Sequence, residues 1–395
     1  MLDPTYLDGC ADDIVDIFIE TEREILNDVV RRIIKNNGLS DTARWQIQKS
    51  KAIGLLNGDL KKYLSAALQD ASVDVDEVFR DASVKAIAAD DAIYALNGVK
   101  PVSVLESDNM KSIILQGTKE TKLLLRNFTK TTANVADMSL YNSLDKAYLL
   151  TQIGAYDYNS AIRKAVNELA SLGMTKVAYP SGHVDKTDVA VRRAVLTGLN
   201  QTCGNLQLYR ADDVGCDLVE VTAHMGARPS HALWQGKIYS LSGKTRGYDN
   251  FYDATGYGTG DGLCGWNCRH SFFPYYEGIS GRTFTAFTTR ESIKENEKIY
   301  ELTQKQRYYE RRIRAAKTEC VALNQAVLSA TDDQQEKMFR EDFASASVKL
   351  KRREAALKAF ISQNPILNRQ PEREWKSGFN RSVSAKAVWA NRKSK

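Results

Sequence analysis

The sequence predicts an α+β protein that is predominantly helical, in which a small central α+β domain is flanked by helical N- and C-terminal regions. Apolar residues recur at helical spacing before residue 150 and again after residue 280, whereas short alternating segments lie between them. The chain has 395 residues and is 43% hydrophobic and 26% charged, so it can bury two or three cores. We therefore expect three consecutive regions, namely residues 1–150, 151–280 and 281–395.

The first region consists of successive predicted helices. A run at helical spacing extends from Ile14 to Ile33, and Asn37-Gly38 follows it as a C-terminal stop. Ser40-Asp41-Thr42 can cap a second helix, which Asn57-Gly58 would end. Helical patterns resume further along, although residues 97–118 show no clear pattern. We expect a succession of helices that are separated by these stops.

The second region mixes helices with short strands. Asp157 or Asn159 can cap a helix that Gly173 ends, and a long helix begins at about Thr187. Short strands are predicted over residues 176–179, 217–222 and 237–241. Helices that alternate with a few strands in this way predict an α+β domain.

The third region is basic. Residues 281–395 hold 25 Lys and Arg against 14 Asp and Glu, a net charge of +11, which leaves −5 for residues 1–280. Helical spacing returns from Ile279, and after Pro365 and Pro371 the end of the chain is expected to be a basic tail. A solvated helical face explains this charge as well as contact with nucleic acid or an acidic partner does.

The composition argues against export and against membrane insertion. No apolar run approaches the ~18 residues of a membrane span. The N-terminus carries Asp3, Asp8, Asp12 and Asp13 where a signal peptide would carry lysines. Six cysteines scattered along the chain do not resemble a secreted disulfide framework, so we expect reduced thiols.

Histidine and cysteine residues are concentrated in one stretch. Three of the four histidines, His224, His231 and His270, lie there together with Cys264 and Cys268. Zn²⁺ favours thiolate and imidazole ligands in four-coordinate sites, so Cys264, Cys268 and His270, completed by His231 or His224, form a candidate structural zinc site. The alternative is that buried thiols and a hydrogen-bonded histidine fix an irregular loop without a metal.

A catalytic role for the same residues is less well supported. A hydrolytic zinc needs a general base, for which Asp261 and Glu220 are candidates, but the sequence has no His-Glu-x-x-His motif. A nucleophile pair formed by Cys268 and His270 has no identifiable orienting group. We therefore expect no enzyme activity.

Glycines crowd the segment Gly256–Gly262. The segment has the glycine content of a phosphate-binding loop, but neither helical periodicity nor a Lys-Ser/Thr end follows it. We predict a tight irregular turn, in which glycine permits positive φ and close backbone packing. Arg228, Arg269 and Lys237 would make its surface cationic, which suits a carboxylate-bearing or phosphate-bearing partner.

Residues 224–241 and 256–270, followed by Pro274, resemble the family called phage minor capsid protein 2. That family is similar in pattern to the Mu F-like head morphogenesis proteins, which share an Arg-x-x-His-x-x-x-x-Gly-Lys-like segment and a later Cys-Arg-Cys/His segment. The matching positions here are Arg228, His231, Gly236, Lys237, Cys268, Arg269 and His270. The resemblance extends in both directions over most of the chain. Relatives with a Cys-Arg-Cys ending have a thiol where this chain has His270, and either residue can bind zinc.

The resemblance implies a structural protein of a tailed-phage head, present in few copies and associated with the portal vertex inside the capsid. It implies a role in head assembly and in DNA packaging or ejection, with the portal protein and other head proteins as partners. Packaged DNA could contact the basic C-terminal region, and the protein would be in the host cytoplasm during assembly. Other hypotheses are a zinc-dependent hydrolase, a toxin-like enzyme carried in the virion, and a sequence-independent DNA-binding head protein.

Overall fold

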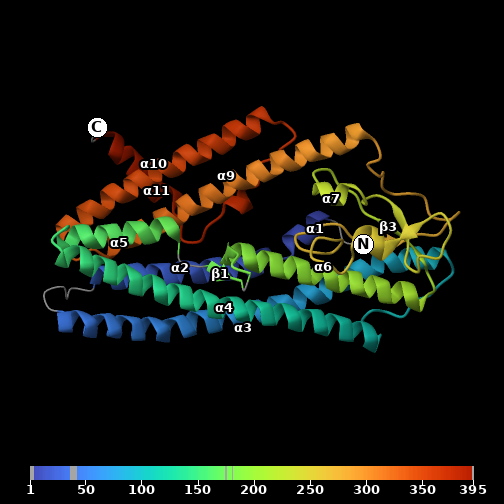
Figure 1. Ribbon diagram of the computed structural model, residues 1–395, viewed down its shortest axis with the longest axis horizontal. Coiled ribbons are helices and arrows are strands. Elements are labelled where there is room, and N and C mark those ends of the chain that lie inside the picture. Colours follow the sequence, from blue (N-terminus) through green and yellow to red (C-terminus); the bar gives the residue numbers. More distant parts are fainter. Residues whose placement is uncertain (1–3, 36–41, 174–175, 180, 394–395) are drawn as a thin grey trace. The chain divides into compact units, whose positions relative to one another are not determined.

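The structure is a computed structural model that describes residues 4–35, 42–173, 176–179 and 181–393 (Figure 1). Within these residues it is predominantly helical with two small sheets, as predicted. The helices are α1 Pro4–Gly9, α2 Asp12–Lys35, α3 Thr42–Leu96, α4 Asp108–Gln152, α5 Tyr158–Leu172, α6 Thr187–Asp213, α7 Pro229–Ala232, α8 Phe251–Thr255, α9 Arg290–Ser329, α10 Asp333–Gln363 and α11 Arg381–Lys393, with a 3₁₀ turn η1 Pro371–Glu374. The strands are β1 Lys176–Ala178, β2 Val184–Lys186, β3 Leu218–Val221, β4 Ile238–Ser240, β5 Asp249–Asn250 and β6 Phe272–Pro274. Of the helices described, none combines the length and the apolar character that a membrane span requires.

The prediction that Asn57-Gly58 ends a helix is wrong. Helix α3 continues through both residues, from Thr42 to Leu96. Leu56, Leu60 and Leu64 are buried along one face across this point, and their packing outweighs the roughly 1 kcal/mol that a glycine costs inside a helix. The predicted stop at Asn37-Gly38 lies outside the described residues, as do Ser40 and Asp41 of the predicted cap.

The contacts among the described residues divide the chain into two compact units, each built from three separate stretches. Unit 1 comprises Met1–Val15, Asp70–Arg126 and Val189–Thr303. Unit 2 comprises Asp16–Gln69, Asn127–Asp188 and Gln304–Lys395. Helices α2, α3, α4, α6 and α9 contribute residues to both units. The division into three consecutive regions, residues 1–150, 151–280 and 281–395, stays a prediction from the sequence.

Unit 1 is built around a four-stranded sheet with the order β5-β4-β3-β6. The central strand β3 pairs antiparallel with β4 and with β6, and Val219 lies opposite both Tyr239 and Pro274. Strand β5 adds to β4 in parallel. The strands predicted over residues 217–222 and 237–241 are confirmed. Strands β5 and β6 were missed because neither Asp249-Asn250 nor Phe272-Phe273-Pro274 alternates apolar with polar residues.

Helix α6 lies close to both the sheet and α4 in unit 1. Its side chain Gln207 donates from Nε2 to the carbonyl of Phe272 in β6 at 2.5 Å. A Cβ atom at Gly117 in α4 would lie 1.9 Å from Oγ1 of Thr202 in α6, and one at Gly198 would lie 2.2 Å from Oγ1 of Thr121. The two glycines therefore permit the close approach of α4 and α6.

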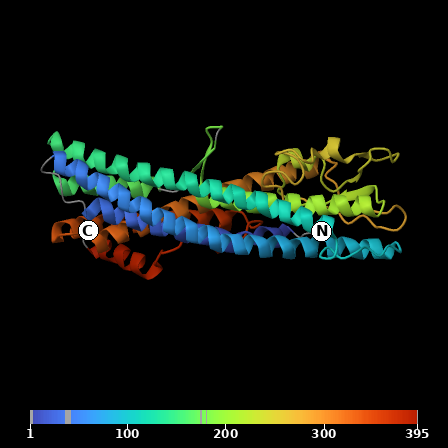
Figure 2. The same ribbon diagram turned by 90° about the horizontal axis from the view of Figure 1, so that it is seen from below.

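Unit 2 is a helical assembly in which α5, α9, α10 and α11 pack with parts of α2, α3 and α4. Figures 1 and 2 show α3 and α4 side by side, and Lys49 of α3 pairs with Asp145 of α4 at 2.7 Å. Helix α5 begins and ends as predicted, because the Asp157 side chain caps it and Gly173 ends it. A short antiparallel hairpin of β1 and β2 also belongs to this unit.

The segment after Pro371, expected to be a basic tail, contains η1 and α11 and is a folded part of unit 2. Lys317 and Glu22, which lie on other helices of this unit, bind this segment. Lys317 of α9 donates from Nζ to the carbonyl of Glu374 at 2.6 Å, and Lys376 forms a buried ion pair with Glu22 of α2. Lys376 of this segment is therefore structural, because it pairs with a buried carboxylate within unit 2.

Candidate metal centre

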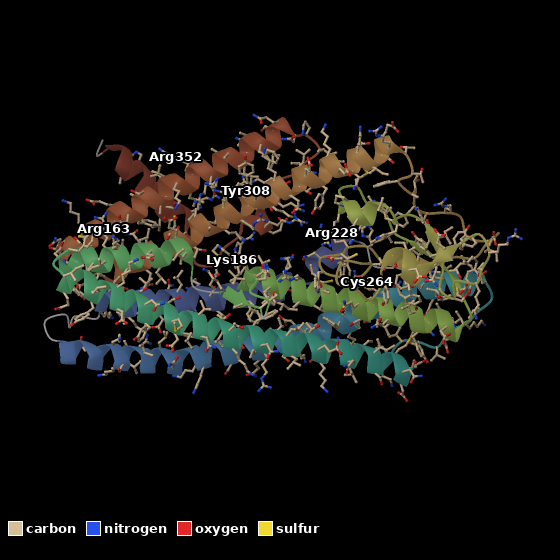
Figure 3. The ribbon with its side chains drawn as sticks, viewed as in Figure 1. Arg163, Lys186, Arg228, Cys264, Tyr308 and Arg352 are labelled. Atoms are coloured by element: carbon tan, nitrogen blue, oxygen red, sulfur yellow. The ribbon has the colours of Figure 1, made fainter. Side chains whose placement is uncertain are left out.

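The candidate site lies on two loops of unit 1. The loop after β3 leads through Arg228 into α7, which carries His231. The second stretch runs from α8 to β6 and carries Cys264, Cys268 and His270 (Figure 3). Antiparallel pairing of β3 with β6 brings the two loops together at one end of the sheet.

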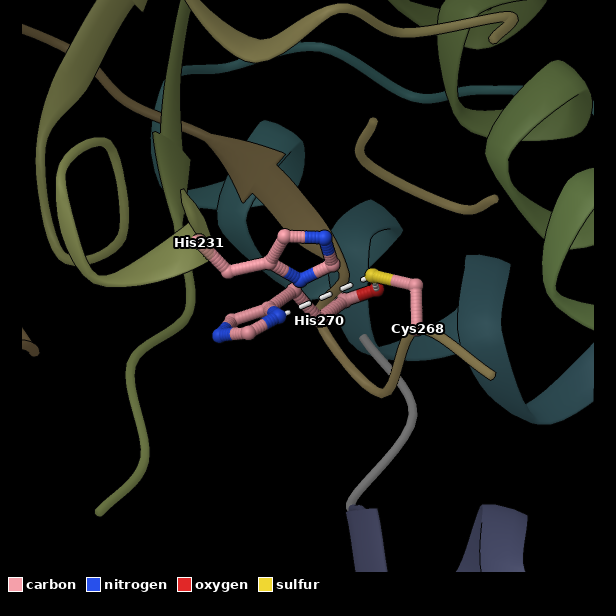
Figure 4. Close-up of side chains that lie close together, drawn as sticks. All are labelled: His231, Cys268 and His270. Atoms are coloured by element: carbon pink, nitrogen blue, oxygen red, sulfur yellow. Dashed lines mark hydrogen bonds between the residues drawn. The ribbon is translucent and has the colours of Figure 1, made fainter. Parts of the chain in front are cut away.

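His231, Cys268 and His270 form a compact buried cluster. One potential ligand atom from each residue lies within 4.8 Å of the others, and the three side chains are at most 5% exposed. Figure 4 shows the two imidazole rings next to the thiol, with a hydrogen bond of 3.6 Å between Cys268 Sγ and Nδ1 of His270. The sequence prediction named these three residues, and the structure brings them together.

The hydrogen bonds around His270 fix its tautomer. The backbone N–H of His224 donates to Oε1 of Gln235 at 3.0 Å, so this atom of the amide must be the oxygen. The same Oε1 lies 2.9 Å from Nε2 of His270, which must therefore carry the proton. In the neutral ring, Nδ1 then has a free electron pair, and this pair faces the thiol of Cys268.

His231 is oriented in the same way. Its Nε2 lies 2.9 Å from the backbone carbonyl of Asp261, which can only accept, so Nε2 carries the proton. The remaining nitrogen, Nδ1, has the free electron pair. Figure 4 shows one nitrogen of the His231 ring turned toward His270 and Cys268. Two imidazole electron pairs and one thiol are thus directed into the same small volume.

Burial keeps the cluster uncharged. It lowers the pKa of His270 well below its usual range, and the neighbouring His224 and His231 lower it further. Burial also lowers the pKa of His231, and it raises the pKa of Cys268 to about 11. At neutral pH the thiol is therefore protonated, which is the opposite of an activated cysteine nucleophile.

Cys264, the fourth predicted ligand, lies beside the cluster. Among the described residues it does not belong to the group within 4.8 Å. Its thiol contacts the His270 carbonyl at 3.9 Å, and a Cβ atom on Gly204 of α6 would lie 3.4 Å from its sulfur. His224, the alternative ligand, stacks its ring on that of His270 with 4.4 Å between centroids.

The other positions of the family motif hold the loops in place. Arg228 pairs with Asp261 at 3.4 Å and donates to the Trp266 carbonyl at 3.0 Å, so it joins the first loop to the second. Gly236 has φ +67°, and a Cβ atom there would lie 2.8 Å from the carbonyl oxygen of residue 285. Lys237 accepts at its backbone carbonyl from the N–H of Val221. Arg269 is partly buried.

The glycine-rich segment is a tight irregular turn, as predicted. A Cβ atom on Gly262 would lie 1.9 Å from the carbonyl oxygen of Gly256, and one on Gly265 would lie 2.3 Å from that of Gly260. Successive turns are therefore stacked directly on each other. This packing places the carbonyl of Asp261 where it accepts the proton of His231.

The two candidate general bases have other roles. Glu220 is fully buried, and its carboxylate accepts from the backbone N–H groups of Thr283 and Phe284 at 2.7–3.0 Å. Asp261 pairs with Arg228 and its side chain is 85% exposed.

Sequence reasoning missed two residues of the site, Gln235 and Asn200. The amide of Gln235 binds the His270 ring, and the amide of Asn200 donates to the carbonyls of Cys268 and His270. Amide side chains of this kind form no recognisable sequence pattern.

A family model and one relative each match most of the chain, and a second relative matches about a third of it. The sequence model of a family described as phage minor capsid protein 2 matches residues 2–362. The "Structural protein" of Lactococcus phage LL-H is 25% identical over 350 residues, which cover 85% of this chain and 89% of that protein. The "Structural protein" of Lactococcus phage mv4 is 32% identical over 127 residues, or 32% of this chain and 90% of that protein. No solved structure matches the chain.

Proposed function

Because this chain belongs to the phage minor capsid protein 2 family, we propose that it is a structural component of the tailed-phage head, located at the portal vertex inside the capsid. In this role it acts in head assembly and in DNA packaging or ejection, and the portal protein and other head proteins are its partners. The observation that carries the proposal is the extent of the family match, residues 2–362, which includes most of both units.

A structural role accounts for the features of the candidate site. The thiol of Cys268 is buried, and the carboxylate of Glu220 accepts from backbone N–H groups. Each of these residues joins two segments of unit 1.

The location can be tested with heads assembled in the presence and in the absence of the portal protein. We expect this chain to copurify with portal-containing heads in a low, constant ratio to the major capsid protein, and to be missing from portal-free heads. Quantitative mass spectrometry of both preparations gives the ratio, with the major capsid protein as the internal standard. Equal incorporation into portal-free heads would contradict portal association, and its absence from both would contradict a head protein altogether.

Contact with packaged DNA is a second part of the proposal, and it rests on the basic faces of α9 and α10. Arg311, Arg312, Lys351 and Arg352 are exposed there, and Figure 3 labels Arg352 together with Tyr308. The guanidinium of Arg353 donates to the carbonyl of Arg312 at 2.6 Å, and its pKa is lowered by burial and then by Arg312. Cations gathered in this way favour binding of a polyphosphate backbone.

Neutralising three of these charges tests the DNA contact. The triple variant Arg311→Gln, Arg312→Gln and Arg352→Gln should bind DNA more weakly, and the slope of log K against log [salt] should fall by about 2–3, since each phosphate contact contributes about 0.9. Lys51, Lys61 and Lys130 are exposed lysines of α3 and α4 in the same unit, and their triple Gln variant is the control. Equal slopes for both variants would exclude this surface as the DNA contact.

A further inference from the structure

We infer that His231, Cys268 and His270, with Cys264 as the fourth ligand, bind a zinc ion that joins the two loops at the end of the unit 1 sheet. This site goes beyond the proposed place of the protein in the head, because it concerns how unit 1 itself is held together. It rests on the positions of the donor atoms and on the groups that orient them.

The donor atoms have the spacing that tetrahedral zinc requires. With Zn–S of about 2.3 Å, Zn–N of about 2.0–2.1 Å and tetrahedral angles, the sulfur and nitrogen ligands are separated by about 3.6 Å. Cys268 Sγ and Nδ1 of His270 are 3.6 Å apart. The donor atom of His231 lies within 4.8 Å of both, so a shift of about an ångström closes the set.

Both histidines are oriented as zinc ligands usually are. In metal sites the ring nitrogen that is not bound to the metal typically donates to a carbonyl or carboxylate, which fixes the tautomer and the ring plane. Here Nε2 of His231 donates to the Asp261 carbonyl and Nε2 of His270 donates to the Gln235 amide oxygen, both at 2.9 Å. Each Nδ1 thereby keeps its electron pair free, and that of His270 faces Cys268.

Cys264 completes the set. The sulfurs of Cys264 and Cys268 lie 3.9 Å and 4.0 Å from the same atom, the carbonyl oxygen of His270. Cys264 becomes a ligand when its side chain turns from α6 toward the other three residues. Its backbone φ of +60° is rare for a residue with a side chain, and the tight turn that imposes it also keeps the thiol beside the cluster.

The donor types select zinc over other common cations. Ca²⁺ and Mg²⁺ bind oxygen ligands, and the described cluster offers two imidazoles and a thiol. Two nitrogens and two thiolates in a buried tetrahedron are a typical closed structural site, in which no coordination position is left for a substrate. Each cysteine that binds zinc releases its thiol proton to solvent, and the sulfur–zinc bond takes its place.

The test uses the full-length protein, stripped of metal with a chelator and reconstituted with Zn²⁺ or Co²⁺ alone. We expect one metal ion per chain by elemental analysis and, with Co²⁺, the absorption of a tetrahedral thiolate complex. The melting temperature should rise when Zn²⁺ is added, because a ligand that binds the folded state stabilises it. A wild-type protein that binds less than about one zinc per ten chains overturns the site, since stoichiometric binding is what a structural site requires.

Variants then assign the ligands. Cys268→Ser should abolish the thiolate absorption, and His231→Gln should remove the zinc-dependent rise in melting temperature. Cys264→Ser should weaken zinc binding at least tenfold, and unchanged affinity in that variant would overturn the four-ligand set. The matched control is Cys216→Ser, because Cys216 is another buried thiol of unit 1 that lies outside the cluster. Zinc that is retained equally in Cys268→Ser, His231→Gln and the control would place the metal elsewhere.

Discussion

Replacing Gly262 with alanine should destabilise unit 1 strongly. The added Cβ atom would lie 1.9 Å from the carbonyl oxygen of Gly256 and 2.9 Å from that of Thr255. Both obstacles are backbone atoms, so rotation of a side chain cannot relieve the overlap. The stacked turns must separate, which endangers the hydrogen bond from the N–H of Leu263 to the Thr255 carbonyl. Overpacking of about 1–3 kcal/mol and one lost hydrogen bond of about 1 kcal/mol together give about 2–4 kcal/mol.

The assay is thermal unfolding combined with hydrogen exchange of the peptides between residues 255 and 268. At about 2–4 °C per kcal/mol for a unit of this size, the melting temperature should fall by about 4–16 °C, with faster exchange in the stacked turns. Gly281→Ala is the control, because its Cβ atom would meet none of the described atoms within 4 Å. If Gly262→Ala melts within about 1 °C of the control, the stacked geometry of the turn is wrong.

Three further substitutions test other parts of the fold. Gly58→Ala should stabilise the protein by about 0.5–1 kcal/mol in denaturant unfolding, because Gly58 lies inside a helix with open space around it in the described structure; destabilisation would instead support a helix stop there. Glu220→Gln should cost about 1–3 kcal/mol, since an amide cannot accept all of the backbone N–H bonds that the buried carboxylate accepts; calorimetry showing no loss would contradict this role. Burial raises the pKa of Asp217, but hydroxyl and backbone N–H donors outweigh it and lower the pKa to about 2. Its stabilising contribution is therefore complete above the unfolded value near 4 and is lost as the pH falls through about 2, and Asp217→Asn should flatten the stability profile in that window.

Local signals in the sequence predicted the elements that local interactions determine. Asp157 and Gly173 bound α5 because a capping side chain and a glycine with positive φ act within one helical turn. Asn57-Gly58 carries the same kind of signal, yet α3 passes through it because leucines packed in the core of unit 2 override the local preference. Contacts between distant segments decide that outcome, and no window of a few residues contains them.

The candidate site, too, could be predicted only in part, because contacts between distant segments shape it. His231, Cys268 and His270 could be named from the sequence because few residue types bind zinc and they occur close together. The orientation of the rings could not be predicted, because it depends on the amide of Gln235 and on the Asp261 carbonyl. Pairing of β3 with β6 brings these groups into contact, and the residues of β6, Phe272-Phe273-Pro274, show no alternation that would reveal a strand.

The ion pair between Lys376 and Glu22 joins residues that are 354 positions apart in the chain. Together with the hydrogen bond from Lys317 to the Glu374 carbonyl, this ion pair attaches residues 374–376 to α9 and α2 within unit 2. During translation, α2 leaves the ribosome long before Lys376, with which its Glu22 pairs. Unit 2 therefore cannot be complete until residues 371–377 have left the ribosome.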